Sequence, residues 1–165
     1  MDPFIDEKIT NNSIIQLNYI LEEQYHITPV REAYGPNLNE GIIHEFCAGS
    51  SFSGDLHGSC YFAMEAYTKI LILPYLLANV EIDNLYPEMV ENILSSFVQD
   101  FFKLIETSLK EIITRVTMNP LELYNHRFVS LPVEQYRKYT TIFYLKSKTD
   151  NSYLGRVYIY LAIRK

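Results

Sequence analysis

The stretch YPEMVENILSSFVQDFFKLIETSLKEII, Tyr86–Ile113, is the most informative part of the chain. Its apolar residues recur at spacings of three and four, which is the period of one face of an α-helix. They are Val90, Ile93, Leu94, Phe97, Phe101, Leu104, Ile105, Leu109 and Ile112. The spacing predicts one continuous helix with the centre of this stripe, Phe97, Phe101 and Ile105, in the core.

Four polar residues form the opposite side of the same helix. At about 100° per residue, Asn92, Ser96, Gln99 and Lys103 fall roughly opposite the apolar stripe. We therefore expect them to be exposed and treat them as the candidate site. The alternative is that these side chains only solvate an outer helix face.

Composition limits the class of protein. The chain has 165 residues, 48% of them hydrophobic, which suits one domain over 1–165 with a core of its own. Its net charge is −6 and its 14 Lys and Arg form no dense cluster, so nucleic acid and membrane are not expected as partners. MDPFIDEK does not resemble a signal peptide, and the apolar run Ile70–Val80 is too short to span a bilayer, so a cytoplasmic location is expected.

The remaining elements follow from periodicity and from turn-forming residues. The first half predicts a helix, two strands around the Ser53-Gly54-Asp55 turn, and a helix bent or interrupted at Pro74, with Pro29, Gly35 and Pro36 in an irregular connection. These elements are Pro3–Gln24, Gly41–Phe52, Leu56–Met64 and Glu65–Ala78.

The second half ends in strands. His126–Leu131 is a short strand candidate after the break at Asn119-Pro120, and Tyr139–Lys146 with Tyr153–Ile163 predicts a hairpin. The order of elements predicts an α+β fold in which long helices pack on a largely antiparallel sheet.

Several local strings, in this order, resemble the CheX/CheC family of chemotaxis phosphatases. They are the start Asp2-Pro3-Phe4-Ile5, the strand opening Gly54-Asp55-Leu56-His57-Gly58, the Leu131-Pro132 segment and the closing hairpin Thr140–Ile163. The resemblance covers nearly the whole chain and implies a CheC-like fold with a single, CheX-like site.

The family's active pair is Glu-x-x-Asn, followed four residues later by Gly and then by Thr-x-Leu. Matching the last element to Thr107-Ser108-Leu109 places Ser96 at the acid, Gln99 at the amide and Lys103 at the glycine. A literal Glu-x-x-Asn, Glu81–Asn84, stands 15 residues before this register and remains the alternative.

The resemblance also implies the chemistry. The substrate is the phosphoryl-aspartate of a CheY-like receiver domain, which holds the Mg²⁺ itself, so no cofactor is expected on this chain. The amide orients the attacking water, and the acid pairs with a receiver lysine. Gln99 keeps a carboxamide, but Ser96 cannot form a salt bridge, and losing one such partner often costs about 10²–10³ in rate.

The expected function is therefore binding of a phosphorylated receiver, with weak or lost phosphatase activity. The alternatives are an active phosphatase that uses Gln99 and a non-catalytic dimeric interaction module. A homodimer is also expected from the resemblance, with exposed sheet-edge residues of the C-terminal hairpin as a suggested seam.

Two His-x-x-Cys pairs raise the question of a metal site, because zinc takes such ligands. They are His44 with Cys47 and His57 with Cys60. Residues three apart on a strand point to opposite faces, so we expect no metal and two reduced thiols. Nothing marks the third group that a Cys–His catalytic pair requires.

Overall fold

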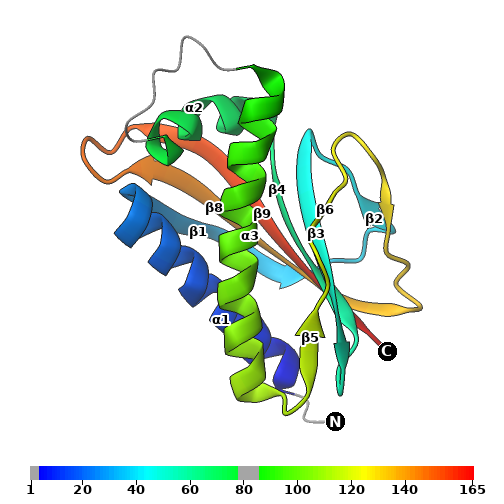
Figure 1. Ribbon diagram of the computed structural model, residues 1–165. Coiled ribbons are helices and arrows are strands. Elements are labelled where there is room, and N and C mark those ends of the chain that lie inside the picture. Colours follow the sequence, from blue (N-terminus) through cyan, green and yellow to red (C-terminus); the bar gives the residue numbers. More distant parts are fainter. Residues whose placement is uncertain (1–3, 78–85) are drawn as a thin grey trace.

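The computed structural model describes residues 4–77 and 86–165, in which helices pack on one face of an antiparallel sheet (Figure 1). The strand order is β1-β8-β9-β4-β3-β5, with β6 also paired to β3, and β2 and β7 form a separate two-stranded sheet. The α+β prediction is confirmed. The helical elements are α1 Ile5–Tyr19, the π-helical turn η1 Ile20–Gln24, α2 Ala66–Leu76 and α3 Pro87–Ile112. The strands are β1 Ile27–Pro36, β2 Gly41–Ile42, β3 Phe46–Gly54, β4 Gly58–Met64, β5 Val116–Met118, β6 Glu122–Leu123, β7 Val129–Ser130, β8 Tyr136–Ser147 and β9 Tyr153–Arg164.

Helix α3 is the long continuous helix that the apolar stripe predicts. It starts at Pro87, whose missing N–H costs nothing in a first helical turn. Phe97 and Phe101 are at most 2% exposed, and their rings pack edge-on against Phe62 of β4 at 5.7 and 5.9 Å. Val98 and Phe102 are also buried, so the core face is wider than the predicted stripe.

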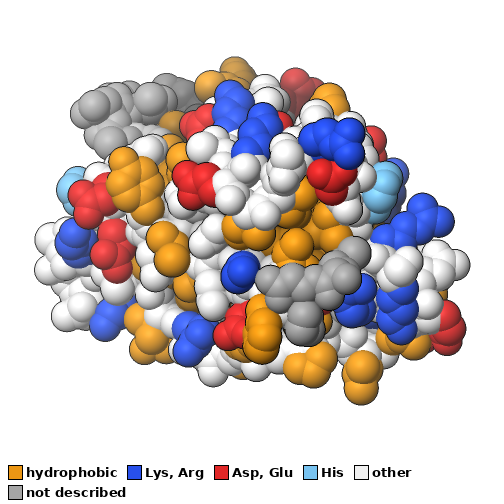
Figure 2. Space-filling view, turned by 90° about the horizontal axis from the view of Figure 1, so that it is seen from below, with side chains coloured by type: hydrophobic (Ala, Val, Ile, Leu, Met, Phe, Trp, Pro, Cys, Tyr) orange, Lys and Arg blue, Asp and Glu red, His pale blue; other side chains and the backbone are white. Residues whose placement is uncertain are grey.

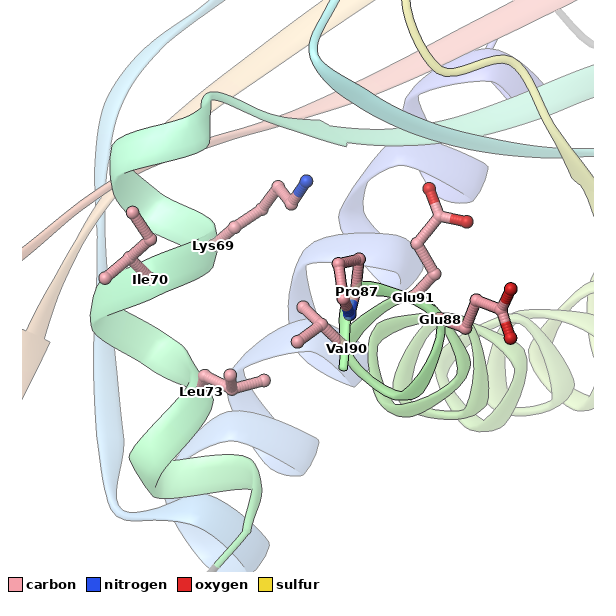
Figure 3. Close-up of a pocket in the computed structure, with 7 residues that line it drawn as sticks. All are labelled: Lys69, Ile70, Leu73, Pro87, Glu88, Val90 and Glu91. Carbon is pink, nitrogen blue, oxygen red and sulfur yellow. The ribbon is translucent and has the colours of Figure 1, made fainter. Parts of the chain in front are cut away.

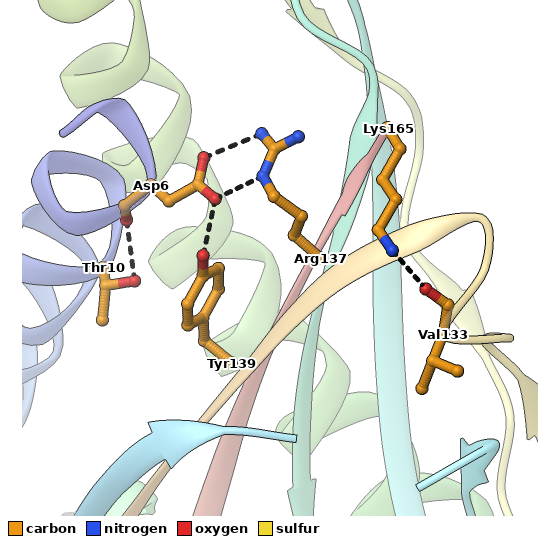
Figure 4. A network of polar contacts seen from close by, with 6 residues as sticks. All are labelled: Asp6, Thr10, Val133, Arg137, Tyr139 and Lys165. Atoms are coloured by element: carbon orange, nitrogen blue, oxygen red, sulfur yellow. Dashed lines mark hydrogen bonds and ion pairs between the residues drawn. The ribbon is translucent and has the colours of Figure 1, made fainter. Parts of the chain in front are cut away.

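Helix α1 is confirmed, with η1 as its continuation, although its predicted start at Pro3 lies outside the described residues. A polar network docks its first turn onto β8 (Figure 4). The Asp6 carboxylate accepts hydrogen bonds from Arg137 at 2.7 and 3.0 Å and from the Tyr139 hydroxyl at 2.7 Å. Burial alone would raise the pKa of Asp6, but these donors and the charge of Arg137 hold it below its ordinary value.

Helix α2 is held on β9 by one side chain. The buried Thr68 hydroxyl donates to the Arg156 carbonyl at 2.9 Å and accepts from the Arg156 N–H at 3.0 Å. Gly155 comes just before it with φ +97°, and a Cβ there would lie 2.2 Å from Thr68 Oγ1. Only glycine allows this close approach. Pro74 lies inside α2, which continues past it to Leu76, so the helix is not interrupted at the proline.

Some predicted boundaries are wrong. The stretch with Pro29 and Pro36 is a strand, β1, and not an irregular connection. It lies at the edge of the sheet, where a proline need not donate to a neighbouring strand. The strand predicted over Gly41–Phe52 is broken, because β2 leaves to pair with β7 while β3 begins only at Phe46.

The C-terminal hairpin is confirmed as β8 and β9, but it does not lie at an edge of the sheet. Strand β8 lies between β1 and β9, and β9 lies between β8 and β4. Both strands already have a hydrogen-bonded neighbour on each side, so the suggested dimer seam along this hairpin is wrong.

The face of the sheet away from the helices carries a second, smaller hydrophobic cluster. Its buried members are Ile42, Cys47, Tyr61, Ala63, Leu131, Tyr160 and Ala162.

At the end of the molecule where α3 and the β3–β4 hairpin end, acidic and basic side chains are interspersed around a hollow lined by hydrophobic ones (Figure 2). Among the described helices, none is long and apolar enough to cross a membrane.

Candidate functional site

The predicted polar row is exposed along the outer side of α3. Asn92, Ser96, Gln99 and Lys103 are all exposed, and α3 presents them from a helix whose other side is fixed in the core. None of the four side chains forms a hydrogen bond or ion pair with a residue that the structure describes. Their polar groups are therefore available to a partner. The predicted exposure of Ser96, Gln99 and Lys103 is confirmed.

Gln99 and Lys103 border a polar hollow on one side of α3. Its volume is about 250 Å³, and the facing wall comes from β3 and from the segment after β5. Ser50 and Asn119 are the polar residues of that wall. The Ser50 hydroxyl donates to the Asn119 carbonyl at 2.5 Å, and the Asn119 side chain donates to Ser51 Oγ at 2.7 Å. These bonds fix the wall, so a group that enters beside Gln99 meets a preorganised surface.

Ser96 opens toward the other side of α3. With Asn92 it lines a separate hollow of about 320 Å³, in which Tyr25, Leu76 and Leu77 are prominent. The structure thus places Ser96 and Gln99 on one exposed row but gives each a different neighbourhood, apolar for Ser96 and polar for Gln99. A partner that contacts both must straddle the helix.

Asp100 supplies a carboxylate on the Ser96 side. It is exposed, and its charge adds to burial in raising the pKa of Tyr25. A carboxylate is therefore present near the row, though not at the position where the resemblance expects one. On the Gln99 side, Glu106 is paired with Lys110 at 3.1 Å.

Sequence reasoning missed Ser50 and Asn119 as neighbours of Gln99. They lie 49 and 20 positions from it in the chain, and the antiparallel pairing of β3 with β5 brings them together. The helical period of α3 carries no information on such a pairing, and the only signal was the Asn119-Pro120 break.

A further hollow lies between α2 and the amino end of α3 (Figure 3). It has a volume of about 490 Å³, and Ile70, Leu73 and Val90 give it an apolar lining beside Lys69 and Glu91. The alternative pair Glu81 and Asn84 lies outside the described residues, so the structure does not place it.

The two His-x-x-Cys pairs do not form a site in the part of the chain that the structure describes. Cys47 and Cys60 are buried free thiols, and burial raises the pKa of each to about 12. His44 lies in the connection before β3 rather than on the predicted strand, with its Nε2 2.6 Å from the Tyr160 hydroxyl. The described residues contain no group of three or more potential metal ligands.

Comparison with known proteins identifies the fold. No family model matches the chain, and no curated protein matches its sequence. Among solved structures, the chemotaxis protein CheX from Desulfovibrio desulfuricans superposes with a TM-score of 0.75 at 11% identity, over 94% of this chain and 99% of that one. A CheC-like superfamily protein from Shewanella sp. PV-4 gives 0.75 at 12% identity, over 96% and 98%. CheX in the CheX–CheY–BeF₃–Mg²⁺ complex from Borrelia burgdorferi gives 0.62 at 13% identity, over 97% of each chain. The chain has the CheX/CheC-like fold, as the resemblance implied.

Proposed function

We propose that this chain binds a phosphorylated CheY-like receiver domain through the exposed row of α3 and that its phosphatase activity is weak or lost. The observation that carries the proposal is Gln99, an exposed carboxamide without a described hydrogen-bond partner at the centre of the row. The Borrelia burgdorferi CheX, which shares the fold, is bound to CheY with BeF₃ and Mg²⁺.

The proposed role of Gln99 is to position the attacking water molecule. A carboxamide that enters the receiver's cleft accepts a hydrogen bond from the attacking water and aligns it with the phosphoryl group. The Mg²⁺ belongs to the receiver in this scheme, so the chain itself supplies no cofactor. The fixed wall formed by Ser50 and Asn119 favours one orientation of whatever enters beside Gln99.

Two substitutions weaken the site relative to the family pattern. Ser96 provides a hydroxyl where a carboxylate would pair with the receiver's lysine, and Lys103 adds a cation where the family has glycine. Both changes disfavour a cationic group at the docking surface. We therefore propose that binding persists while hydrolysis is slow, the active phosphatase being the alternative.

The test measures the decay of a purified, phosphorylated CheY-like receiver with and without this protein. Gln99→Ala should abolish any acceleration, and Ser96→Glu should increase it by restoring the ion pair. Glu111→Gln, an exposed change on α3 outside the row, is the matched control and should leave the decay unchanged.

Two outcomes contradict the proposal. Rapid dephosphorylation that persists in Gln99→Ala would mean that other residues form the active pair, with Glu81 and Asn84 as the leading candidates. Absence of binding to phosphorylated receivers, measured by titration calorimetry, would leave only a shared fold, because folds host unrelated functions.

The homodimer remains a proposal, and it cannot form by strand addition to β8 or β9, because each has a paired strand on both sides. The larger sheet has β1 at one edge, and β5 and β6, which both pair with β3, at the other. A bulge between Arg31 and Ala33, together with Pro29 and Pro36, interrupts β1, and such features discourage pairing along an edge. We therefore expect a dimer, if light scattering detects one, to use side-chain packing rather than strand addition at β1.

A further inference from the structure

A polar pocket of about 340 Å³ lies on the face of the sheet opposite α3. On β3 and β4, Phe52 and Phe62 point into the helix-side core, so the alternate residues Ser51, Ser59 and Tyr61 point to the other face. Ser51 pairs with Ser59, and Ser59 pairs with Ala162 of β9. The small side chains of Ser51 and Ser59, which are paired across β3 and β4, leave a hollow that larger neighbours surround.

The rim of the hollow is positively charged. The cation is the guanidinium of Arg164 at the end of β9, and the imidazole of His57 in the β3–β4 hairpin lies beside it. A backbone hydrogen bond from the Arg164 N–H to the His57 carbonyl at 2.9 Å links the two residues. Neither side chain forms a hydrogen bond or ion pair with a described residue. Among the described residues that line the hollow there is no carboxylate, although the chain has a net charge of −6. The nearby Asp55, in the same hairpin as His57, is paired with Arg115 at 3.2 Å.

Hydroxyl groups complete the lining with hydrogen-bond donors. Ser51 Oγ accepts from the Asn119 side chain at 2.7 Å, which leaves its own proton free for a ligand. Burial raises the pKa of Tyr61, so its phenol stays protonated at neutral pH. Ser53 and Tyr136 contribute two further hydroxyls.

We propose that this pocket binds a phosphate group, either as free phosphate or as part of a small phosphate ester. An unpaired guanidinium binds two phosphate oxygens at once, and neutral hydroxyl donors satisfy the others. The volume exceeds that of phosphate alone and leaves room for a short organic substituent. The site is separate from the exposed row of α3, so it does not rest on the proposed function.

The experiment titrates the full chain with inorganic phosphate and, separately, with O-phosphoserine, by calorimetry at constant ionic strength. Arg164→Gln should weaken binding by about tenfold or more, because it removes a charged hydrogen-bond donor, and His57→Ala should weaken it because it removes the imidazole N–H donor. Arg31→Gln, an exposed arginine on β1, is the matched control and should not change the affinity. Asn119 is left intact because it also lines the hollow beside Gln99.

The two probes distinguish the sources of the phosphate group. Tighter binding of O-phosphoserine than of phosphate supports a small phosphate ester as ligand, whereas equal binding supports the free anion. Heat that is the same for chloride and phosphate, or phosphate binding that Arg164→Gln and Arg31→Gln weaken equally, would overturn the proposal. Because Arg164 and His57 are at the surface, circular dichroism of the variants should match that of the wild type.

Discussion

Asp6 joins α1 to β8 through three hydrogen bonds, two from Arg137 and one from Tyr139. Because these donors hold the pKa of Asp6 below its ordinary value of 3.8, the carboxylate stabilises the fold above that pH. We predict that Asp6→Asn lowers the free energy of unfolding by about 1–3 kcal/mol at pH 7. The difference from wild type should shrink as the pH falls through the pKa of the folded state.

Urea denaturation at pH 7 and at pH 3 measures this effect. Glu7→Gln is the control, because Glu7 is exposed in the same first turn of α1 and has the same relation to the helix dipole. A loss as large for Glu7→Gln as for Asp6→Asn would mean that the helix dipole, and not the contact with β8, accounts for the stabilisation.

In the exposed row of α3, the sequence predicts the exposure of single side chains but not their neighbours. The exposure of Ser96, Gln99 and Lys103 follows from the helical period alone, because one side of α3 must face the core. The wall opposite Gln99 does not follow, since Ser50 and Asn119 reach it only through the pairing of β3 with β5. Local periodicity determines which way a side chain points but not what it meets.

At the scale of elements, α2 depends on Thr68 for its attachment to β9. We predict that Thr68→Val lowers the free energy of unfolding by about 1–3 kcal/mol, because the change keeps the shape but removes two hydrogen bonds to Arg156. Thr107→Val on α3 is the control, since the Thr107 hydroxyl bonds only a carbonyl of its own helix at an exposed position. Thermal denaturation of the three proteins gives the comparison. Equal melting temperatures for Thr68→Val and wild type would contradict this role.

The elements differ in how far the sequence predicts them. Helix α3 carries a long periodic pattern, α1 and α2 are recognisable from shorter apolar segments, and the β8–β9 hairpin from its β-branched and aromatic residues; all are confirmed. Strand β1 was missed because Pro29 and Pro36 signal irregular structure, and only its place at the sheet edge makes them compatible with a strand. The two-residue strands β2, β6 and β7 are too short to show any period and form only because tertiary pairing supplies their partners.

At the scale of the whole molecule, segments distant in sequence are interleaved in one sheet. Strand β1 pairs with β8 over residues 27–36 and 139–147, and β9 inserts between β8 and β4. The helices pack on this sheet, and some of their contacts join the two ends of the chain, such as the ion pair of Asp6 with Arg137. We therefore propose that residues 1–165 form one domain, because no cut in the chain would leave a complete sheet on either side.

This proposal predicts a single cooperative unfolding transition for the full chain. Far-UV circular dichroism follows the helices and the sheet, and near-UV circular dichroism follows the 14 Tyr, since the chain has no Trp. Both signals should give the same midpoint in urea. Asp6→Asn and Thr68→Val, which loosen different helices, should each shift the two midpoints together, because neither helix can detach without exposing the shared core. Two resolved transitions, or a variant that shifts only one signal, would show that α1 or α2 unfolds independently of the sheet and would contradict the single-domain proposal.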